Sequence, residues 1–295
     1  MCSRIVRLIS RASRRMVFGA ALSMLTASVF AGPVFFSTGD PDGQMATASR
    51  PDGAGKTEIE SADDFVLTQP TTTITGATFT GLLTGGTTAA DIGEVRVEIY
   101  RVFPLDSDTT RTPAVPTRVN SPSDVELSDR DTASGNLSFT TSVLKASFAA
   151  SNSVLNGINP FPNQRTGGEG AITGQEVAFT VDFLVPLVLP ADHYFFIPQV
   201  EITDANGDFF WLSAPKSIAP PGIPFPAGFS DLQSWIRNDN LAPDWLRVGT
   251  DIVGGAPAPT FNASFSLISE VPEPATLLLI AVGLAVLWWG LKRKP

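Results

Sequence analysis

Two reactive residue types are almost absent from this 295-residue chain, which contains one cysteine, Cys2, and one histidine, His193. A single cysteine excludes an intrachain disulfide, and the two residues together are too few for a Cys/His zinc site. The sequence also lacks a Gly-x-Ser-x-Gly elbow, a phosphate-binding loop and an HExxH motif. The hydrolase, nucleotide-binding and metalloprotease classes that depend on these motifs are therefore excluded.

Positive charge is scarce in the middle of the chain. Eight of the 20 basic residues lie at the two ends, which leaves 12 in residues 32–274 against all 29 acids, a formal charge of −17. An anionic surface repels phosphate backbones, so we do not expect nucleic acid as a partner.

The first 31 residues have the composition of an export signal. The basic segment 1–15 precedes the apolar stretch Met16–Phe30. Val29 and Ala31 provide small residues at the −3 and −1 positions of a cleavage site before Gly32. The alternative is an uncleaved anchor, but the apolar stretch is short and is interrupted by glycine and serine. We expect a signal peptide over 1–31, and hence an encounter with the export machinery.

The carboxyl end contains a second apolar segment. Residues 275–291 hold no charge, and at 1.5 Å per residue they would span about 25 Å as a helix. Two tryptophans near the end of this segment suit the headgroup level, and the basic tail 292–295 suits the cytoplasmic side. A buried core helix is the alternative, but it leaves the basic tail unexplained. We therefore expect a transmembrane helix over 275–291, with the preceding body outside the cytoplasm.

A short proline motif, Pro272, Glu273 and Pro274, stands directly before this segment. Proline disfavours helical geometry in the residue before it, so the motif predicts extended backbone at the membrane surface. Together with the apolar helix, the basic tail and the amino-terminal signal, the motif resembles the PEP-CTERM sorting signal of Gram-negative bacteria, here residues 271–295. The resemblance implies processing by an exosortase, a membrane cysteine peptidase. It also implies an envelope or extracellular destination, in a setting often associated with exopolysaccharide and biofilm.

The body, residues 32–270, shows the two-residue hydrophobic alternation of half-buried strands. The alternation is clearest in Glu94–Val102, Glu176–Val185 and Phe261–Leu267. Further predicted strands are Asp64–Thr68, Ile74–Leu83, His193–Ile202 and Asp208–Ser213. Because helical periodicity is confined to the two ends, we predict one all-β domain, an antiparallel, jelly-roll-like β-sandwich.

Two stretches break the alternation and predict long surface loops. Pro104–Asn136 is rich in Thr, Ser, Pro and Asp, and Pro215–Ser230 contains five prolines. Loops of this length in a compact domain are usually functional or flexible.

The body also resembles extracellular domains of other PEP-CTERM proteins. The similarity is carried by the runs GDPDGQMATASRP, SADDFVL, DHYFFIPQV and DLQSWIRNDNLAPDWLRVGTDI. Those domains are uncharacterised, so the resemblance supports one domain without supplying a reaction.

Carbohydrate is a candidate ligand of the body. Trp211, Trp235 and Trp245 lie outside the apolar ends, and exposed aromatic rings beside polar groups suit sugar rings. The polar stretch Arg237–Asn240 separates two of these tryptophans and is a candidate groove lining. The alternative is that all three indoles belong to the core.

Calcium is a weaker candidate, and we expect no other cofactor. Asp204, Asn206 and Asp208 place oxygen atoms at alternate positions, as a hard cation prefers. The alternative is a plain hairpin turn at Asn206-Gly207 between two strands.

A catalytic role finds little support in the sequence. With 29 acids, a carboxylate pair at the spacing of a glycosidase can arise by chance. Glu94 and Glu98 share a strand face that we expect to be solvated, and His193 fits a structural position at a strand start. The favoured interpretation is an exported, exosortase-sorted envelope or matrix protein without enzymatic activity. The alternatives are a carbohydrate-binding module for exopolysaccharide and, last, a glycan-active enzyme.

Overall fold

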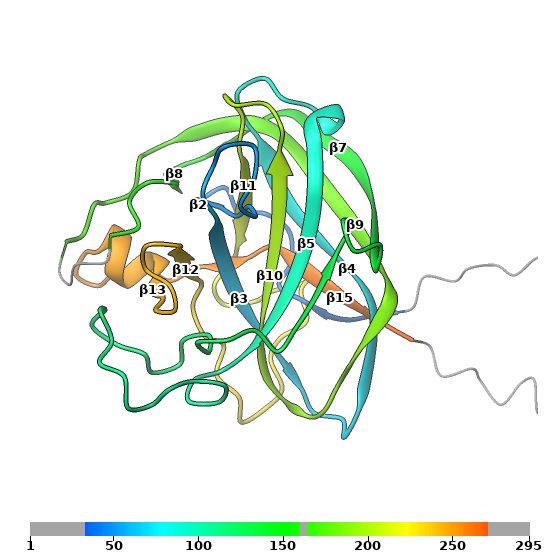
Figure 1. Ribbon diagram of the computed structural model, residues 1–295, viewed down its shortest axis with the longest axis vertical. Coiled ribbons are helices and arrows are strands. Elements are labelled where there is room, and N and C mark those ends of the chain that lie inside the picture. The colour runs from blue at the N-terminus through cyan, green and yellow to red at the C-terminus, as the bar shows by residue number, and fades with distance from the viewer. Residues whose placement is uncertain (1–32, 160–163, 271–295) are drawn as a thin grey trace, which may run out of the picture. The chain divides into compact units, whose positions relative to one another are not determined.

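The computed structural model describes residues 33–159 and 164–270, which form two facing β-sheets (Figure 1). The nine-stranded sheet contains β1 (Val34–Ser37), β2 (Met45–Ala48), β4 (Thr72–Leu83), β7 (Leu137–Ala150), β8 (Asn152–Val154), β9 (Ile172–Leu189), β11 (Phe209–Ala214), β14 (Asn262–Ala263) and β15 (Phe265–Ser269). The six-stranded sheet contains β3 (Ile59–Leu67), β5 (Ile92–Arg101), β6 (Ser128–Asp131), β10 (Asp192–Ile202), β12 (Trp235–Asn238) and β13 (Leu246–Arg247). Two short helical turns, η1 (Ala89–Asp91) and η2 (Val248–Val253), complete the described elements.

Strand β4 organises the larger sheet. One of its edges pairs with β9 along its whole length, and β9 pairs in turn with β7. Along its other edge, β15 pairs with residues 74–79 and β11 pairs with residues 81–83. In the smaller sheet all pairs are antiparallel, in the order β13-β12-β3-β10-β5-β6.

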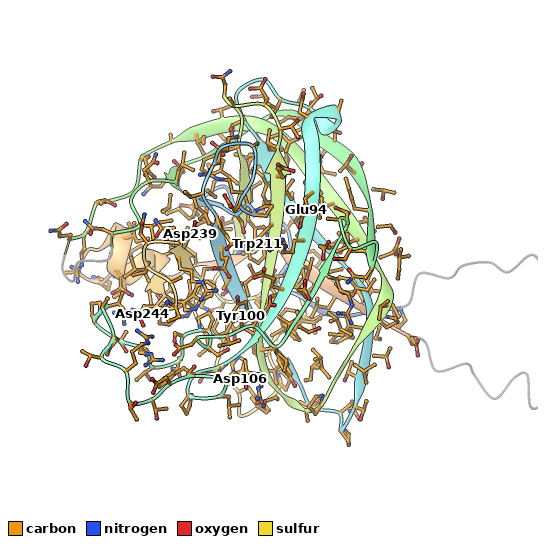
Figure 2. All side chains as sticks on the ribbon, in the orientation of Figure 1. Glu94, Tyr100, Asp106, Trp211, Asp239 and Asp244 are labelled. Atoms are coloured by element: carbon orange, nitrogen blue, oxygen red, sulfur yellow. The ribbon has the colours of Figure 1, made fainter. Side chains whose placement is uncertain are left out.

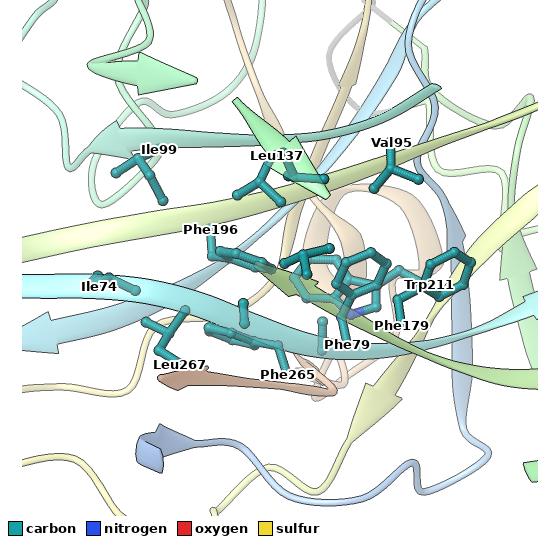
Figure 3. Close-up of a cluster of buried hydrophobic side chains, with 14 of the residues drawn as sticks. Ile74, Phe79, Val95, Ile99, Leu137, Phe179, Phe196, Trp211, Phe265 and Leu267 are labelled. Carbon is teal, nitrogen blue, oxygen red and sulfur yellow. The ribbon is translucent and has the colours of Figure 1, made fainter. Parts of the chain in front are cut away.

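Aromatic rings fill the space between the sheets (Figure 3). Phe196 of the smaller sheet stacks on Phe265 of the larger one, with ring centroids 4.9 Å apart. Phe79 and Phe179 stack at the same distance on neighbouring strands of the larger sheet. Offset or edge-on aromatic pairs add to the free energy gained by burying the rings. This core is the main connection between the two sheets.

The expected two-sheet, all-β architecture is confirmed, and the three alternating segments lie in β5, in β9 and in β14 with β15. The first predicted loop differs, because its last part forms β6, which pairs with β5. Among the strand pairs of the described residues, one departs from the antiparallel pattern, the parallel pair β2–β8. The jelly-roll subclass stays a prediction.

The two described ends of the body meet. β1 pairs antiparallel with β15, and the amide of Ser269 donates a hydrogen bond to the carbonyl of Pro33. The predicted signal peptide, the sorting motif and the predicted transmembrane helix lie outside the described residues. Within residues 33–159 and 164–270, no helix combines the length and hydrophobicity needed to cross a membrane.

Candidate functional site

The three candidate tryptophans are all buried. At most 2% of each side chain is exposed. Figure 2 shows Trp211 among the central strands, where its indole N–H donates to the carbonyl of Ser264 at 2.9 Å. Trp245 donates to the carbonyl of Ser123 at 3.2 Å. None of the three offers an open ring face, so the ring-stacking mode expected for sugar binding is not present in this structure.

Trp235 differs from the other two in one respect. Its indole N–H is buried, yet no hydrogen-bond acceptor lies within reach of it among the described residues. An unpaired buried donor costs about 1–3 kcal/mol, and most such groups in folded proteins have a partner. Trp235 is also one of the residues that line a cleft.

This cleft, the loop cleft, lies between two long loops and has a volume of about 420 Å³. We call residues 102–127, between β5 and β6, the first loop, and residues 215–234, between β11 and β12, the second loop. Figure 1 draws the first loop below β12 and β13. The lining comes from the first loop (Thr117, Val119, Asn120), the second loop (Lys216, Ser230, Asp231, Leu232, Gln233) and the adjoining residues Trp235, Arg247 and Thr260. The sequence predicts both loops but not that they meet.

Lys216 anchors the second loop. Its ammonium group donates to the carboxylate of Asp231 at 2.6 Å, to the side-chain oxygen of Asn262 at 2.7 Å and to the carbonyl of Leu232. Because its donors are occupied, Lys216 shapes the cleft wall and holds no free charge for a ligand.

Two buried aspartates lie beneath the same loop. Asp64 accepts hydrogen bonds from the amide of Leu232 at 3.2 Å and lies 2.6 Å from Nε2 of His193. Asp63 accepts from the amide of Ala263 at 2.8 Å. Burial raises the pKa of both carboxyl groups, and in Asp63 the neighbouring Asp64 raises it further. Asp64 of β3 thus connects His193 of β10 with Leu232 of the second loop.

The first loop is anchored by Asp244, which Figure 2 labels near Tyr100. Its carboxylate accepts two hydrogen bonds from Arg111, at 2.6 and 3.0 Å, and one from the amide of Ala114 at 2.6 Å. Burial alone would raise the pKa of Asp244, but these hydrogen bonds outweigh burial, and the pKa is lowered. Both walls of the cleft are thus held by charged side chains that are already paired.

Arg247 is the other cation of the cleft. It forms a two-pronged ion pair with Asp251, at 2.6 and 2.8 Å. Since Lys216 is paired with Asp231, the two cations of the lining are both neutralised. The polar stretch Arg237–Asn240, which begins within β12, does not line the cleft, and Arg237 is turned into the buried network of the sheet.

That network lies on the outer face of the six-stranded sheet, and it contains two neighbouring carboxyl groups, Glu60 and Glu98. Nε and Nη2 of Arg237 both donate hydrogen bonds to the carboxylate of Glu60. The Tyr100 hydroxyl lies 3.0 Å from Glu60 and 3.4 Å from Glu98. Burial and the neighbouring Glu60 raise the pKa of Glu98 to about 9. The expectation of a solvated face was wrong for Glu98, which is 4% exposed.

Two clefts among the described residues each hold a single carboxylate in their lining. The loop cleft holds one carboxylate, Asp231, and a second cleft of about 400 Å³ beside β1 and β15 holds one, Asp40. Neither Glu60 nor Glu98 lines either cleft.

At the candidate calcium turn a lysine supplies positive charge. The ammonium group of Lys56 donates to the carbonyls of Asp204 at 2.9 Å, Ile202 at 3.3 Å and Gly207. The side chain of Asp204 accepts from the amide of Asn206, and Asp208 pairs with Arg50 at 2.6 Å. Within the described part of the chain no group of three acidic, histidine or cysteine side chains is placed to hold a metal. The hairpin alternative was wrong, because β10 and β11 belong to different sheets.

Comparison with known proteins identifies the carboxyl-terminal segment. The family described as the PEP-CTERM protein-sorting motif matches residues 270–294. No curated protein and no solved structure matches the chain significantly. The predicted resemblance is confirmed over this motif, which marks an exported protein that is sorted to the cell surface with an exosortase as its processing partner.

Proposed function

Since the chain ends in a PEP-CTERM sorting motif, we propose that it is a non-enzymatic protein of the cell envelope or extracellular matrix, delivered by exosortase cleavage. The helix predicted over 275–291 holds the exported chain in the membrane before cleavage, and the body is then displayed or released. The observation that carries this proposal is the position of the motif. It begins at residue 270, directly after the last described strand, β15.

This position makes cleavage compatible with the fold. A cut near Pro274 would remove none of the described strands, and signal cleavage after Ala31 would leave β1 intact. The pairing of β1 with β15 would hold both new ends against the body. The jelly-roll-like sandwich we propose for residues 32–270 would thus be the mature product.

The absence of catalysis is supported by the chemistry of the clefts. The loop cleft and the second cleft each contain a single carboxylate, and His193, the only histidine, is held by Asp64 beneath the second loop. Glycoside hydrolysis typically needs two carboxyl groups flanking the substrate bond. A glycan-active enzyme is therefore the last of our candidates.

Intact mass spectrometry of the protein from its own cells, with and without the exosortase, tests the proposal. We expect a mature form that begins at Gly32 and ends near Pro274, and that form should disappear when the exosortase is removed. A form that retains residues 275–295 whether or not the exosortase is present would contradict it.

A second candidate function, carbohydrate binding to exopolysaccharide, is favoured by one observation. Trp235, whose buried indole N–H is unpaired, is one of the residues that line a cleft between two anchored loops. Affinity electrophoresis in exopolysaccharide from the same cells would test it. Retarded migration is expected, and unchanged migration in that polymer would contradict it.

A further inference from the structure

We propose that the loop cleft binds an uncharged saccharide, and that a sugar oxygen accepts the hydrogen bond of the Trp235 indole N–H. This inference rests on the carbohydrate-binding function above and gives that function a site and a ligand class. It replaces the ring-stacking mode, which the burial of the three tryptophans rules out.

The unpaired donor is the first argument. The three buried tryptophans provide an internal comparison, since Trp211 and Trp245 each donate to a backbone carbonyl and Trp235 does not. Only Trp235 lines the loop cleft. A ligand oxygen there would gain a hydrogen bond without breaking one inside the protein, and buried donors that lack a partner favour such a ligand.

Charge is the second argument. Both cations of the lining are neutralised, Lys216 by Asp231 and Arg247 by Asp251. The body around the cleft carries a strong negative charge, which repels an anionic ligand. Hydroxyl groups are polar without charge, and they match a lining whose charges already have partners.

The lining supplies the third argument. Val119 and Leu232 offer apolar surface, while Ser230, Gln233 and Thr260 offer hydroxyl and amide groups. A sugar ring combines C–H faces with hydroxyl edges and therefore needs both kinds of neighbour. The volume of about 420 Å³ lies within the roughly 300–1,000 Å³ usual for small-molecule sites.

The anchoring of the loops is the fourth argument. Lys216 makes hydrogen bonds across the second loop, and Asp244 holds the first loop through Arg111 and Ala114. A wall that is already ordered loses little conformational entropy when a ligand binds. The walls of the cleft are therefore ordered before a ligand binds, and only the side chains that shield the Trp235 nitrogen must shift to admit a ligand oxygen.

The test is a titration of the exported protein, purified from its cells and labelled with ¹⁵N at the indole nitrogens. The probes are maltotriose, cellotriose, mannotriose and chitotriose, with trigalacturonate as the acidic counterpart. We expect at least one uncharged probe to move the indole resonance of Trp235, assigned through Trp235→Phe, and to leave that of Trp211 in place. Calorimetry with the same probe should show an affinity about tenfold lower in Trp235→Phe, as the loss of one hydrogen bond implies.

Two further variants keep the result interpretable. Val119→Trp places a large ring at the rim of the cleft from a side chain that is 68% exposed, so the fold should persist while binding is lost. Trp211→Phe, which also removes an indole N–H, should bind normally. The inference is overturned if no uncharged probe moves the Trp235 resonance at millimolar concentration, or if trigalacturonate alone does.

The same experiments separate this inference from the functions on which it rests. Sugar binding that neither Trp235→Phe nor Val119→Trp weakens would overturn the site while leaving carbohydrate binding intact. Correct exosortase processing without any saccharide binding would overturn carbohydrate binding and leave sorting intact.

Discussion

The two faces of the six-stranded sheet bury side chains in different ways, and β5 shows both. Val95, Val97 and Ile99 point into the core and are fully buried among apolar neighbours. Glu94 and Glu98 point outward, where loops and charged partners cover them unequally. The inner face is stabilised by excluding polar groups, whereas the outer face depends on pairing them. A substitution should therefore act through volume on the inner face and through charge on the outer face.

The outer face itself contains two kinds of acid. Asp244 is held ionised by hydrogen bonds from Arg111 that outweigh its burial, and its pKa is lowered. In Glu98, burial and the neighbouring Glu60 dominate, and its pKa is raised to about 9. The contributions of Asp244 and Glu98 to stability thus change with pH in opposite directions.

The largest effect is expected on the inner face. Phe179→Ala removes a ring that stacks on Phe79 and contacts Phe209 edge-on at 5.3 Å. We expect it to lower the free energy of unfolding by about 4 kcal/mol, as for other aromatic truncations in cores. Denaturant unfolding of the exported protein measures the change. Phe229→Ala is the control, since 44% of that side chain is exposed and its loss should cost far less.

The next effect tests the charged network of the outer face. Arg237→Met keeps a long apolar stem but removes the guanidinium that holds Glu60 and contacts Trp245 at 4.3 Å. Breaking a buried pair leaves a charge without a partner, and we expect a loss of about 3 kcal/mol at pH 7. The matched control is Arg96→Met, because Arg96 pairs with acids on the same face but is 32% exposed. Equal losses in the two variants would contradict the role assigned to burial.

The inner face was predictable from the sequence, because its pattern is local. Residues two apart on a strand point the same way, so the alternation of Val177 and Phe179 in β9 was enough to place them inside. The edge strand β7 was missed, since most of its side chains are at least partly exposed and show no clear alternation.

The outer face and the cleft were much less predictable. Glu98 is covered by groups that approach from distant segments of the chain, including Glu60 of β3. The prolines of 215–230 predicted the second loop, but no spacing in the sequence indicates that it meets the first loop beside Trp235. The three tryptophans looked equivalent because a sequence does not show which indole N–H finds an acceptor.

The next effect, which is smaller per unit of pH, concerns the pH dependence of stability. Because the pKa of Glu98 is raised from 4.5 to about 9, the folded state retains a proton that the unfolded state loses between these values. Stability contributed by Glu98 is therefore lost as pH rises, by up to about 1.4 kcal/mol per pH unit. Glu98→Gln should reduce this slope between pH 5 and pH 8.5, as measured by denaturant unfolding at each pH. Glu94→Gln removes a more exposed carboxylate from the same strand face and is the control. A slope as steep in Glu98→Gln as in the unchanged protein would contradict the prediction.

The smallest effect distinguishes the three tryptophans. Each Trp→Phe change removes the same ring volume, but in Trp211 and Trp245 it also removes a hydrogen bond to a backbone carbonyl. In Trp235 the lost N–H has no acceptor, so its removal deletes an unpaired buried donor. We therefore expect Trp235→Phe to cost about 1 kcal/mol less than either of the other two changes, in line with the net value of one hydrogen bond. Thermal and denaturant unfolding of the three variants measure the difference. A cost for Trp235→Phe equal to that of Trp245→Phe would mean that the Trp235 N–H is already satisfied in the free protein. The loop cleft would then lose the donor that distinguishes it from the rest of the outer face.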